Sequence, residues 1–148
     1  INSNIRDWQS KVSYVPQNLN LIDASILENV AFGEHKNQID FKIFQDAIKS
    51  SELTEFVNSL PDKYNTNVGE KGLKISGGQA QRIVIARSLY QCPNLLILDE
   101  ATNSLDSKTE EAIMETIFKL KDKEQMTIII ISHKDDNIKR CDEILYLN

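Results

Sequence analysis

Apolar and polar residues follow two different periods along this chain. Residues 11–15 (KVSYV) alternate between the two kinds and stop at Pro16, whose missing N–H group suits the end of a strand. Residues 94–100 (NLLILDE) and 127–132 (TIIIIS) are short, nearly continuous apolar runs, the pattern of buried strands in a parallel sheet. The segment DEILYL at 142–147 predicts one more strand.

Helical periods fill the stretches between these strands. Ser25 and Glu28 have the spacing of a capping box, in which each side chain bonds the other residue's backbone N–H, so we expect a helix to begin there. Apolar residues recur at spacings of three and four from about residue 40 to 60 and stop before Pro61, which predicts one or two amphipathic helices. We therefore expect residues 25–60 to be helical.

Two further helices complete the pattern. The polar, glycine-punctuated segment TNVGEKGLK at 66–74 indicates a loop, and the residues after it keep an apolar face up to Tyr90. Residues 107–121 again place apolar side chains on one helical face. Because this helix joins the two continuous apolar strands, it predicts a right-handed βαβ unit, and the fold class is α/β.

Composition and charge limit the class of protein. The chain has 148 residues, of which 41% are hydrophobic and 26% charged, as in one soluble globular domain. The net charge of -5 argues against a nucleic-acid partner, because such proteins usually carry a clustered excess of Lys and Arg. The longest apolar runs, LLIL and IIII, are far shorter than the ~20 residues of a membrane-spanning helix.

Two further features concern the setting of the chain. Cys92 and Cys141 are too few and too far apart to suggest a metal site or a disulfide framework, so we expect two reduced thiols. The sequence begins without methionine and without a leader segment, so we expect it to be a segment of a longer protein.

Polar residues stand where the two buried strands end. Asp99 and Glu100 close one strand, and Ser132 and His133 close the other. In open parallel sheets ligands bind at the carboxyl ends of the strands, where one carboxylate could hold Mg²⁺ and its neighbour could orient a water for attack on a phosphate. The alternative is that these are solvated loop residues, the common fate of charged side chains.

Such chemistry also needs a loop that grips the phosphates of the nucleotide. The spacing of Gly72 and Gly77 imitates the start of a G-x-x-x-x-G-K-[ST] loop, but Gly78 and Gln79 occupy the positions that require Lys and Ser or Thr. No other stretch of this sequence fits that pattern. We therefore expect the phosphate-binding loop to be absent from these 148 residues.

The order of three motifs carries a family resemblance. ISGGQAQRI at 75–83, LLILDEATNSLD at 95–106 and IIIISH at 128–133 resemble the signature, Walker B and H-loop segments of ATP-binding cassette (ABC) ATPases. The resemblance covers the whole chain and implies a partial P-loop NTPase (RecA-like) core with parallel strands plus the ABC helical subdomain. It places that subdomain at about 25–92 and the core strands and crossover helix at about 93–148.

The resemblance also implies roles for particular residues. Glu100 and His133 are the implied catalytic pair, and Asp99 and Gln17 the implied ligands of Mg²⁺. The residues implied to bind ATP are Gln17 in YVPQ, Ser76, Gly77, Gly78 and Gln79 of the signature, and Asp106 of the D-loop. Ile75, Ser104 and the pair Lys134-Asp135 depart from the commonest family pattern without removing a required charge or donor.

The spacing of Ser76 and Gln79 can also be explained without a ligand. Their spacing is that of a capping box, so the two glycines between them would serve only the start of a helix. A helix N-terminus without side chains at Gly77 and Gly78 would also admit a phosphate. The resemblance implies that this phosphate belongs to ATP held by a second ATP-binding domain, so that two domains sandwich the nucleotide.

Two other segments resemble the exporter branch of the family. They are LIDASILENVAFG at 21–33 and TNVGEKG at 66–72, the second of which implies a coupling role for Glu70 and Lys71 in place of a solvated charge pair. QAQRIVIARSLY at 79–90 resembles, more faintly, flippases of lipid-linked oligosaccharides. An exporter would place this chain at the cytoplasmic face of a membrane, attached to a transmembrane domain of the same or a partner chain.

Three functions are therefore weighed. The first is the ATP-hydrolysing part of an exporter, which as an isolated segment would be inactive. The second is a soluble ABC ATPase of the repair or translation type, and the third is a non-catalytic module that only binds other proteins. Apolar spans and a phosphate-binding loop ahead of Ile1 would indicate the first, the loop without spans the second, and neither the third.

Overall fold

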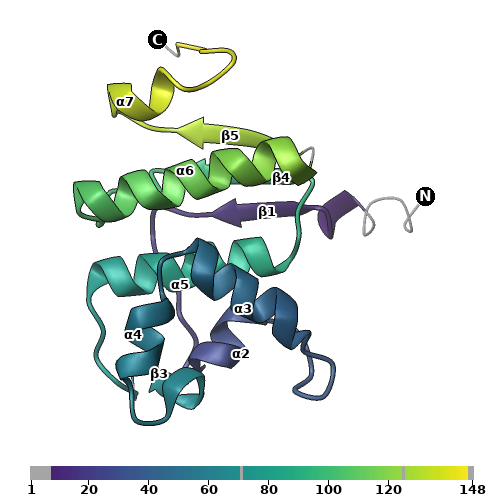
Figure 1. Ribbon diagram of the computed structural model, residues 1–148, viewed down its shortest axis with the longest axis vertical. Helices are drawn as coiled ribbons and strands as arrows, with labels where there is room; N and C mark the ends of the chain where they lie inside the picture. The colour runs from purple at the N-terminus through teal and green to yellow at the C-terminus, as the bar shows by residue number, and fades with distance from the viewer. Residues whose placement is uncertain (1–7, 71, 125, 147–148) are drawn as a thin grey trace.

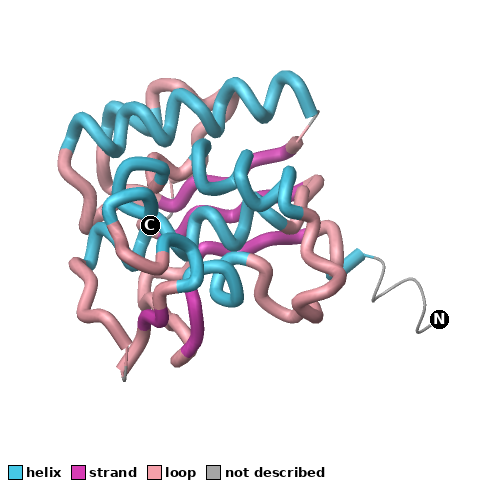
Figure 2. Tube along the Cα trace, turned by 60° about the horizontal axis from the view of Figure 1, so that its bottom comes forward, coloured by secondary structure: helices cyan, strands magenta, loops and turns pink. Residues whose placement is uncertain are grey.

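The computed structural model describes residues 8–70, 72–124 and 126–146. A parallel sheet of three strands forms its centre, in the order β1-β4-β5, and the long helix α6 lies along this sheet (Figures 1 and 2). The elements of this layer are β1 (Val12–Val15), β4 (Leu95–Asp99), α6 (Ser107–Glu124) and β5 (Thr127–Ile131). The three strands and the βαβ unit expected from the sequence are confirmed.

The register of the strands aligns their carboxyl ends. Val15 of β1 pairs with Leu98 of β4, which pairs with Ile130 of β5. Parallel strands in this register end at the same edge of the sheet, so the residues that follow each strand are brought together.

One face of the sheet is covered and the other is open. Val15, Leu96 and Leu98 are buried, whereas Tyr14 of β1 and Ile129 and Ile131 of β5 are 52%, 46% and 49% exposed. The run TIIIIS, expected to be a buried strand, forms the expected strand but is exposed on one face. β5 is an edge strand, and within the described residues its side chains alternate between partly buried and exposed positions.

The second layer is helical and is organised around α5 (Gly77–Tyr90). Ile83, Val84, Ile85 and Ala86 are all buried, so this helix is enclosed on nearly every side and is not simply amphipathic as its sequence suggested. It packs against α2 and α3 and also reaches β1, which links the helical layer to the sheet (Figure 1). The smaller elements are α2 (Ile26–Val30), α3 (Phe41–Ser50), α4 (Thr54–Ser59) and the 3-10 turn η1 (Lys63–Asn65).

The prediction that residues 25–60 are helical was correct for three helices and wrong for the loop at 31–40. It also missed a two-stranded antiparallel sheet formed by β2 (Ala24–Ser25) and β3 (Asn67–Val68). Strands of two residues have no period of their own to detect, and their pairing joins segments far apart in the sequence. The division into subdomains at about residue 92 stays a prediction.

The end of the chain differs from its prediction. Residues 143–146 form no strand, and Ile144, Leu145 and Tyr146 are exposed, while Leu147 lies outside the described residues. A short helix missed by the periodicity, α7 (Asp135–Ile138), follows β5. An apolar run becomes a strand only where it meets the free edge of a sheet, and this segment pairs with no described strand.

The capping box at Ser25 is present and makes stability depend on pH. The Glu28 carboxylate accepts hydrogen bonds from the hydroxyl and the backbone N–H of Ser25, and these, with Lys36, lower the pKa of Glu28 to about 2 from its ordinary value of 4.5. A lowered folded-state pKa stabilises the fold above the unfolded-state pKa, and this contribution is lost as the pH falls through the folded-state value. Denaturant unfolding of wild type and Glu28→Gln should therefore give curves that converge between about pH 5 and pH 2. A constant difference across that range would contradict this prediction.

Candidate functional site

The carboxyl ends of the three parallel strands bring together four residues predicted from the sequence. The amide Nε2 of Gln17, just after β1, donates to Oε2 of Glu100, just after β4, at 2.6 Å. The imidazole Nε2 of His133, just after β5, lies 3.2 Å from Oε1 of the same Glu100 carboxylate. Asp99 is the last residue of β4. We call Gln17, Asp99, Glu100 and His133 the strand-end group.

The backbone at Glu100 determines where its carboxylate points. Its φ angle is 49°, in the left-handed region that non-glycine residues seldom adopt, and its N–H donates to the carbonyl of Ile131 at 2.9 Å. This conformation ends the strand abruptly, so the usual alternation between the two faces of a sheet no longer applies to Glu100. Its carboxylate consequently meets Gln17 and His133.

Two members of this site were missed from the sequence. The hydroxyl of Tyr14 donates to Oδ2 of Asp99 at 2.7 Å, and this hydrogen bond raises the pKa of the Tyr14 hydroxyl. The amide of Asn103 donates to Oε2 of Glu100 at 2.7 Å. Tyr14 could have been found, because it pairs with Ile97 and therefore shares a sheet face with Asp99 two residues further on. The sequence carries no comparable signal for Asn103.

The signature segment forms the N-terminus of α5. Ser76 is the N-cap, its hydroxyl accepts the N–H of Gln79 at 3.1 Å, and its own N–H donates to Oε1 of Gln79 at 2.8 Å. Both bonds of the expected capping box are thus present. They explain Ser76 and Gln79 without any ligand.

The two signature glycines have different reasons to lack a side chain. A Cβ atom at Gly78 would lie 3.1 Å from the carbonyl oxygen of Ser104, so the close approach of that loop favours glycine. A Cβ atom at Gly77 would make only ordinary contacts of 3.8 Å with Ser104. Packing of the described residues therefore does not require glycine at 77.

Asp106 lies beside the signature segment. It caps the start of α6, where its carboxylate accepts the N–H and the hydroxyl of Thr109, and these bonds lower its pKa. A hollow of about 410 Å³ separates the two helix starts and is lined by Ser76, Gly77, Gly78, Arg82, Ser104, Leu105, Asp106 and Thr109. The sequence had indicated only Ser76, Gly77, Gly78 and Asp106 from this set.

The strand-end group and the signature segment lie at the same side of the domain, where β1 and β5 end and α5 begins (Figure 1). Among the hydrogen bonds of the described residues, none joins Gln17, Asp99, Glu100 or His133 to the residues from Ser76 to Gln79. The structure therefore presents the predicted residues as two separate groups.

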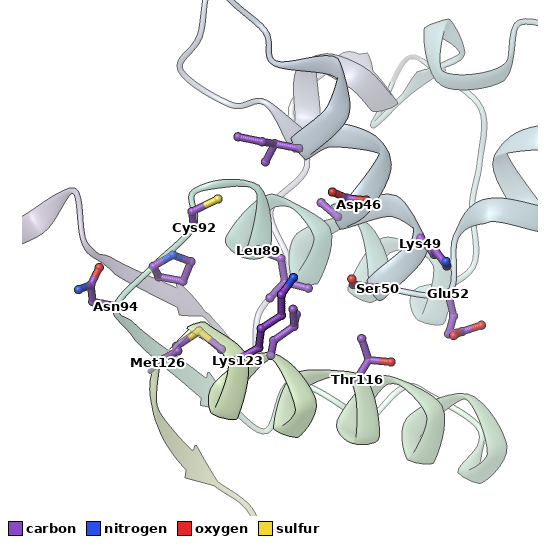
Figure 3. Close-up of a pocket in the computed structure, with 14 residues that line it drawn as sticks. Asp46, Lys49, Ser50, Glu52, Leu89, Cys92, Asn94, Thr116, Lys123 and Met126 are labelled. Carbon is purple, nitrogen blue, oxygen red and sulfur yellow. The ribbon is translucent and has the colours of Figure 1, made fainter.

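A larger hollow of about 620 Å³ lies between α3, the end of α5 and α6 (Figure 3). Asp46, Lys49 and Ser50 of α3 face Thr116 and Lys123 of α6 across it (Figure 3). None of the described residues to which the sequence analysis assigns a catalytic, nucleotide-binding or metal-binding role lines this hollow, so its size does not make it the candidate site.

The exporter-like loop has its own structural constraints. Gly69 has a φ angle of 111°, and a Cβ at Gly72 would lie 2.5 Å from the carbonyl oxygen of Asn67, so both positions require glycine for folding. Glu70 between them is exposed, and Lys71 lies outside the described residues. Their role in coupling stays a prediction.

The described residues lack two features that would have pointed to other functions. No group of three or more His, Cys, Asp and Glu side chains among them could hold a metal ion. No helix in the described part of the chain is long and apolar enough to cross a membrane.

Comparison with known proteins agrees with these motifs. The family model for the ABC transporter matches residues 1–103. Multidrug resistance protein 1 of Plasmodium falciparum is 46% identical over 98% of this chain, and the match covers 10% of that protein. The ATP-dependent lipid A-core flippase of Cupriavidus pinatubonensis is 36% identical over 97% of this chain, which covers 24% of it.

A solved structure has the same fold. It is the structure of a bacterial Atm1-family ABC exporter with ATP bound, with a TM-score of 0.81 and 35% sequence identity. The match covers 90% of this chain and 23% of the exporter chain. The chain belongs to the ABC transporter family, and it matches part of that family's nucleotide-binding domain. It spans between 10% and 24% of the length of the relatives named here.

Proposed function

We propose that this chain supplies the Q-loop, signature, Walker B, D-loop and H-loop of an exporter that couples ATP hydrolysis to transport across a membrane. The observation that carries the proposal is that Gln17 and His133, from two other segments of the chain, both contact the carboxylate of Glu100. Such a carboxylate at the mouth of a parallel sheet can take a proton from a water that attacks a phosphate.

The roles within the strand-end group are those that the family resemblance implies, and the chemistry of the residues fits them. Glu100 is the general base, and His133 Nε2, beside Oε1 of Glu100, is placed to donate a hydrogen bond toward the reacting phosphate. Asp99 and the amide oxygen of Gln17 fit Mg²⁺, which prefers oxygen ligands and usually takes only one or two carboxylates together with phosphates and waters. When bound, the metal would neutralise charge that develops on the phosphates.

The signature segment is proposed to serve a different nucleotide. It lies at a helix N-terminus whose first residue, Gly77, is not required to be glycine for packing, and it borders an open hollow beside Asp106. A helix N-terminus of this kind attracts a phosphate through free N–H groups and its partial positive charge. Because it is separate from the strand-end group, we assign it to ATP held by a second ATP-binding domain.

The proposal of a transmembrane domain is based on the relatives of this chain. A multidrug resistance protein, a lipid A-core flippase and an Atm1-family exporter match over almost the whole chain, and each is several times longer. We therefore propose a transmembrane domain in the same or a partner chain, with this domain at the cytoplasmic face. The soluble ABC ATPase remains the second candidate because the motifs of hydrolysis alone would serve it equally.

The full-length protein tests this function directly. We expect it to remain in the membrane fraction after an alkaline wash and, once reconstituted in lipid vesicles, to hydrolyse Mg-ATP with a kcat on the order of 1–10³ per second. A full-length protein that hydrolyses ATP but is released by the wash would support the soluble alternative. Loss of turnover in every preparation that binds ATP would support the non-catalytic module.

A further inference from the structure

A second polar cluster joins α6 to the segments that follow β4 and β5. Oε1 of Glu110 in α6 accepts the hydroxyl of Thr102 at 2.7 Å and the amide of Asn137 at 2.8 Å, and its Oε2 accepts Nζ of Lys134 at 2.6 Å. We call Thr102, Glu110, Lys134 and Asn137 the Glu110 cluster. One carboxylate thus joins three segments of the chain.

Two of these segments adjoin the proposed site in the sequence. Thr102 lies two residues after Glu100, and Lys134 immediately follows His133. The N–H of Lys134 also donates to the hydroxyl of Ser132, the residue before His133, at 3.0 Å. The Glu110 cluster therefore connects the segment that follows the base to the segment that carries the histidine.

His133 depends on this support because its own packing is slight. Its side chain is 92% exposed, whereas that of Glu100 is 17% exposed. An exposed imidazole has few neighbours to restrict its position, so the backbone beneath it must hold Nε2 within 3.2 Å of Glu100. That backbone is held by β5 on the side that precedes His133. On the side that follows His133 it is held through Lys134 and Asn137.

The Glu110 cluster differs from an ordinary surface ion pair. Thr102 and Asn137 are buried, and the Glu110 side chain is only 12% exposed. Burial opposes ionisation of Glu110, but the hydrogen bonds from Lys134, Thr102 and Asn137 outweigh it and lower the pKa of the carboxyl. A partly buried carboxylate with three donors is costly to disturb, since its loss leaves those donors unpaired.

We propose that Glu110 is a positioning residue, which holds the segment carrying His133 against the segment that follows Glu100. The inference rests on the proposed ATPase function and adds to it a residue outside the family motifs considered above. Glu110 acts only through the placement of His133 and touches no reacting atom.

The test uses kinetics of the full-length protein. Glu110→Gln should lower kcat for ATP by about 10- to 100-fold, the scale of a small misplacement of a catalytic group, while KM for ATP changes by less than about twofold. Glu111→Gln is the matched control, because Glu111 is the exposed neighbour on α6 and its variant should behave as wild type. Wild-type kcat in Glu110→Gln would overturn the proposal.

Two further variants separate positioning from folding. Lys134→Met should lower kcat as Glu110→Gln does. Lys134→Arg should keep kcat near the wild-type value, because arginine keeps the charge and donors for Glu110. Lys134 is the most exposed member of the Glu110 cluster, with 40% of its side chain accessible, so this pair remains informative if Glu110→Gln folds poorly. Equal losses in Lys134→Met and Lys134→Arg would count against positioning.

A double variant decides whether Glu110 acts through His133. If it does, Glu110→Gln combined with His133→Ala should be no slower than His133→Ala alone. If the two effects on kcat multiply, Glu110 does not act through His133. A wild-type protein without ATPase activity would remove the proposed function and this inference with it. An active wild type with an unaffected Glu110→Gln variant would remove only the inference.

Discussion

Glu100→Gln in the full-length protein is expected to bind ATP with nearly wild-type affinity and to hydrolyse it about 10²- to 10⁴-fold more slowly, the usual contribution of a positioned general base. Glutamine keeps the size of the side chain and can still accept from Gln17 or Asn103, but it cannot take a proton from water. Since hydrolysis no longer separates the two ATP-binding domains that sandwich the nucleotide, the ATP-bound dimer should accumulate.

Asp99→Asn provides the contrasting variant. It removes the carboxylate assigned to Mg²⁺, so it should weaken Mg²⁺-dependent ATP binding as well as turnover. Nucleotide affinity, single-turnover hydrolysis and the dimer population should be measured for both variants. Near wild-type hydrolysis by Glu100→Gln would refute its assignment as the base, and identical behaviour of the two variants would refute the division of roles.

The 148-residue chain by itself should show no measurable ATP hydrolysis and only weak ATP binding. Its sequence contains no G-x-x-x-x-G-K-[ST] loop, so Asp99, Glu100 and His133 have no partner that fixes the triphosphate between them. The open sheet face with Tyr14, Ile129 and Ile131 also leaves apolar surface in water.

Calorimetric titration of the purified chain with Mg-ATP, together with a phosphate-release assay, measures both quantities. The full-length protein in the same assays is the positive control. Micromolar affinity with turnover in the 148-residue chain would contradict the prediction, because the residues present would then suffice for catalysis.

The sequence predicted best what depends on local chemistry. The capping boxes at Ser25 and Ser76 and the polar residues at the strand ends were all correctly placed, because their signals lie within a few neighbouring residues. The proximity of Glu100 and His133 followed from one rule, that parallel strands end at a common edge. Gln17 was indicated only by the family resemblance.

The errors arose where distant segments decide the outcome. The β2–β3 pairing joins Ser25 to Asn67, 42 residues further along the chain, and its strands have too few residues to show a period. The edge position of β5 and the unpaired end at Tyr146 depend on which strands are available as neighbours, and periodicity carries no such information. The left-handed backbone of Glu100 could not be predicted either, because glutamate, unlike glycine or asparagine, seldom adopts this conformation.

The pairing of Val15 with Leu98 sets an order of events during protein synthesis. β1 leaves the ribosome long before β4 exists, since residues 16–94 must be translated between them, which takes on the order of 4–16 seconds at ~5–20 residues per second. Within that interval all the residues of α2, α3, α4 and α5 become available, so the helical layer can assemble first. β1 can pair with β4 only after the strand that ends in the proposed base has been made.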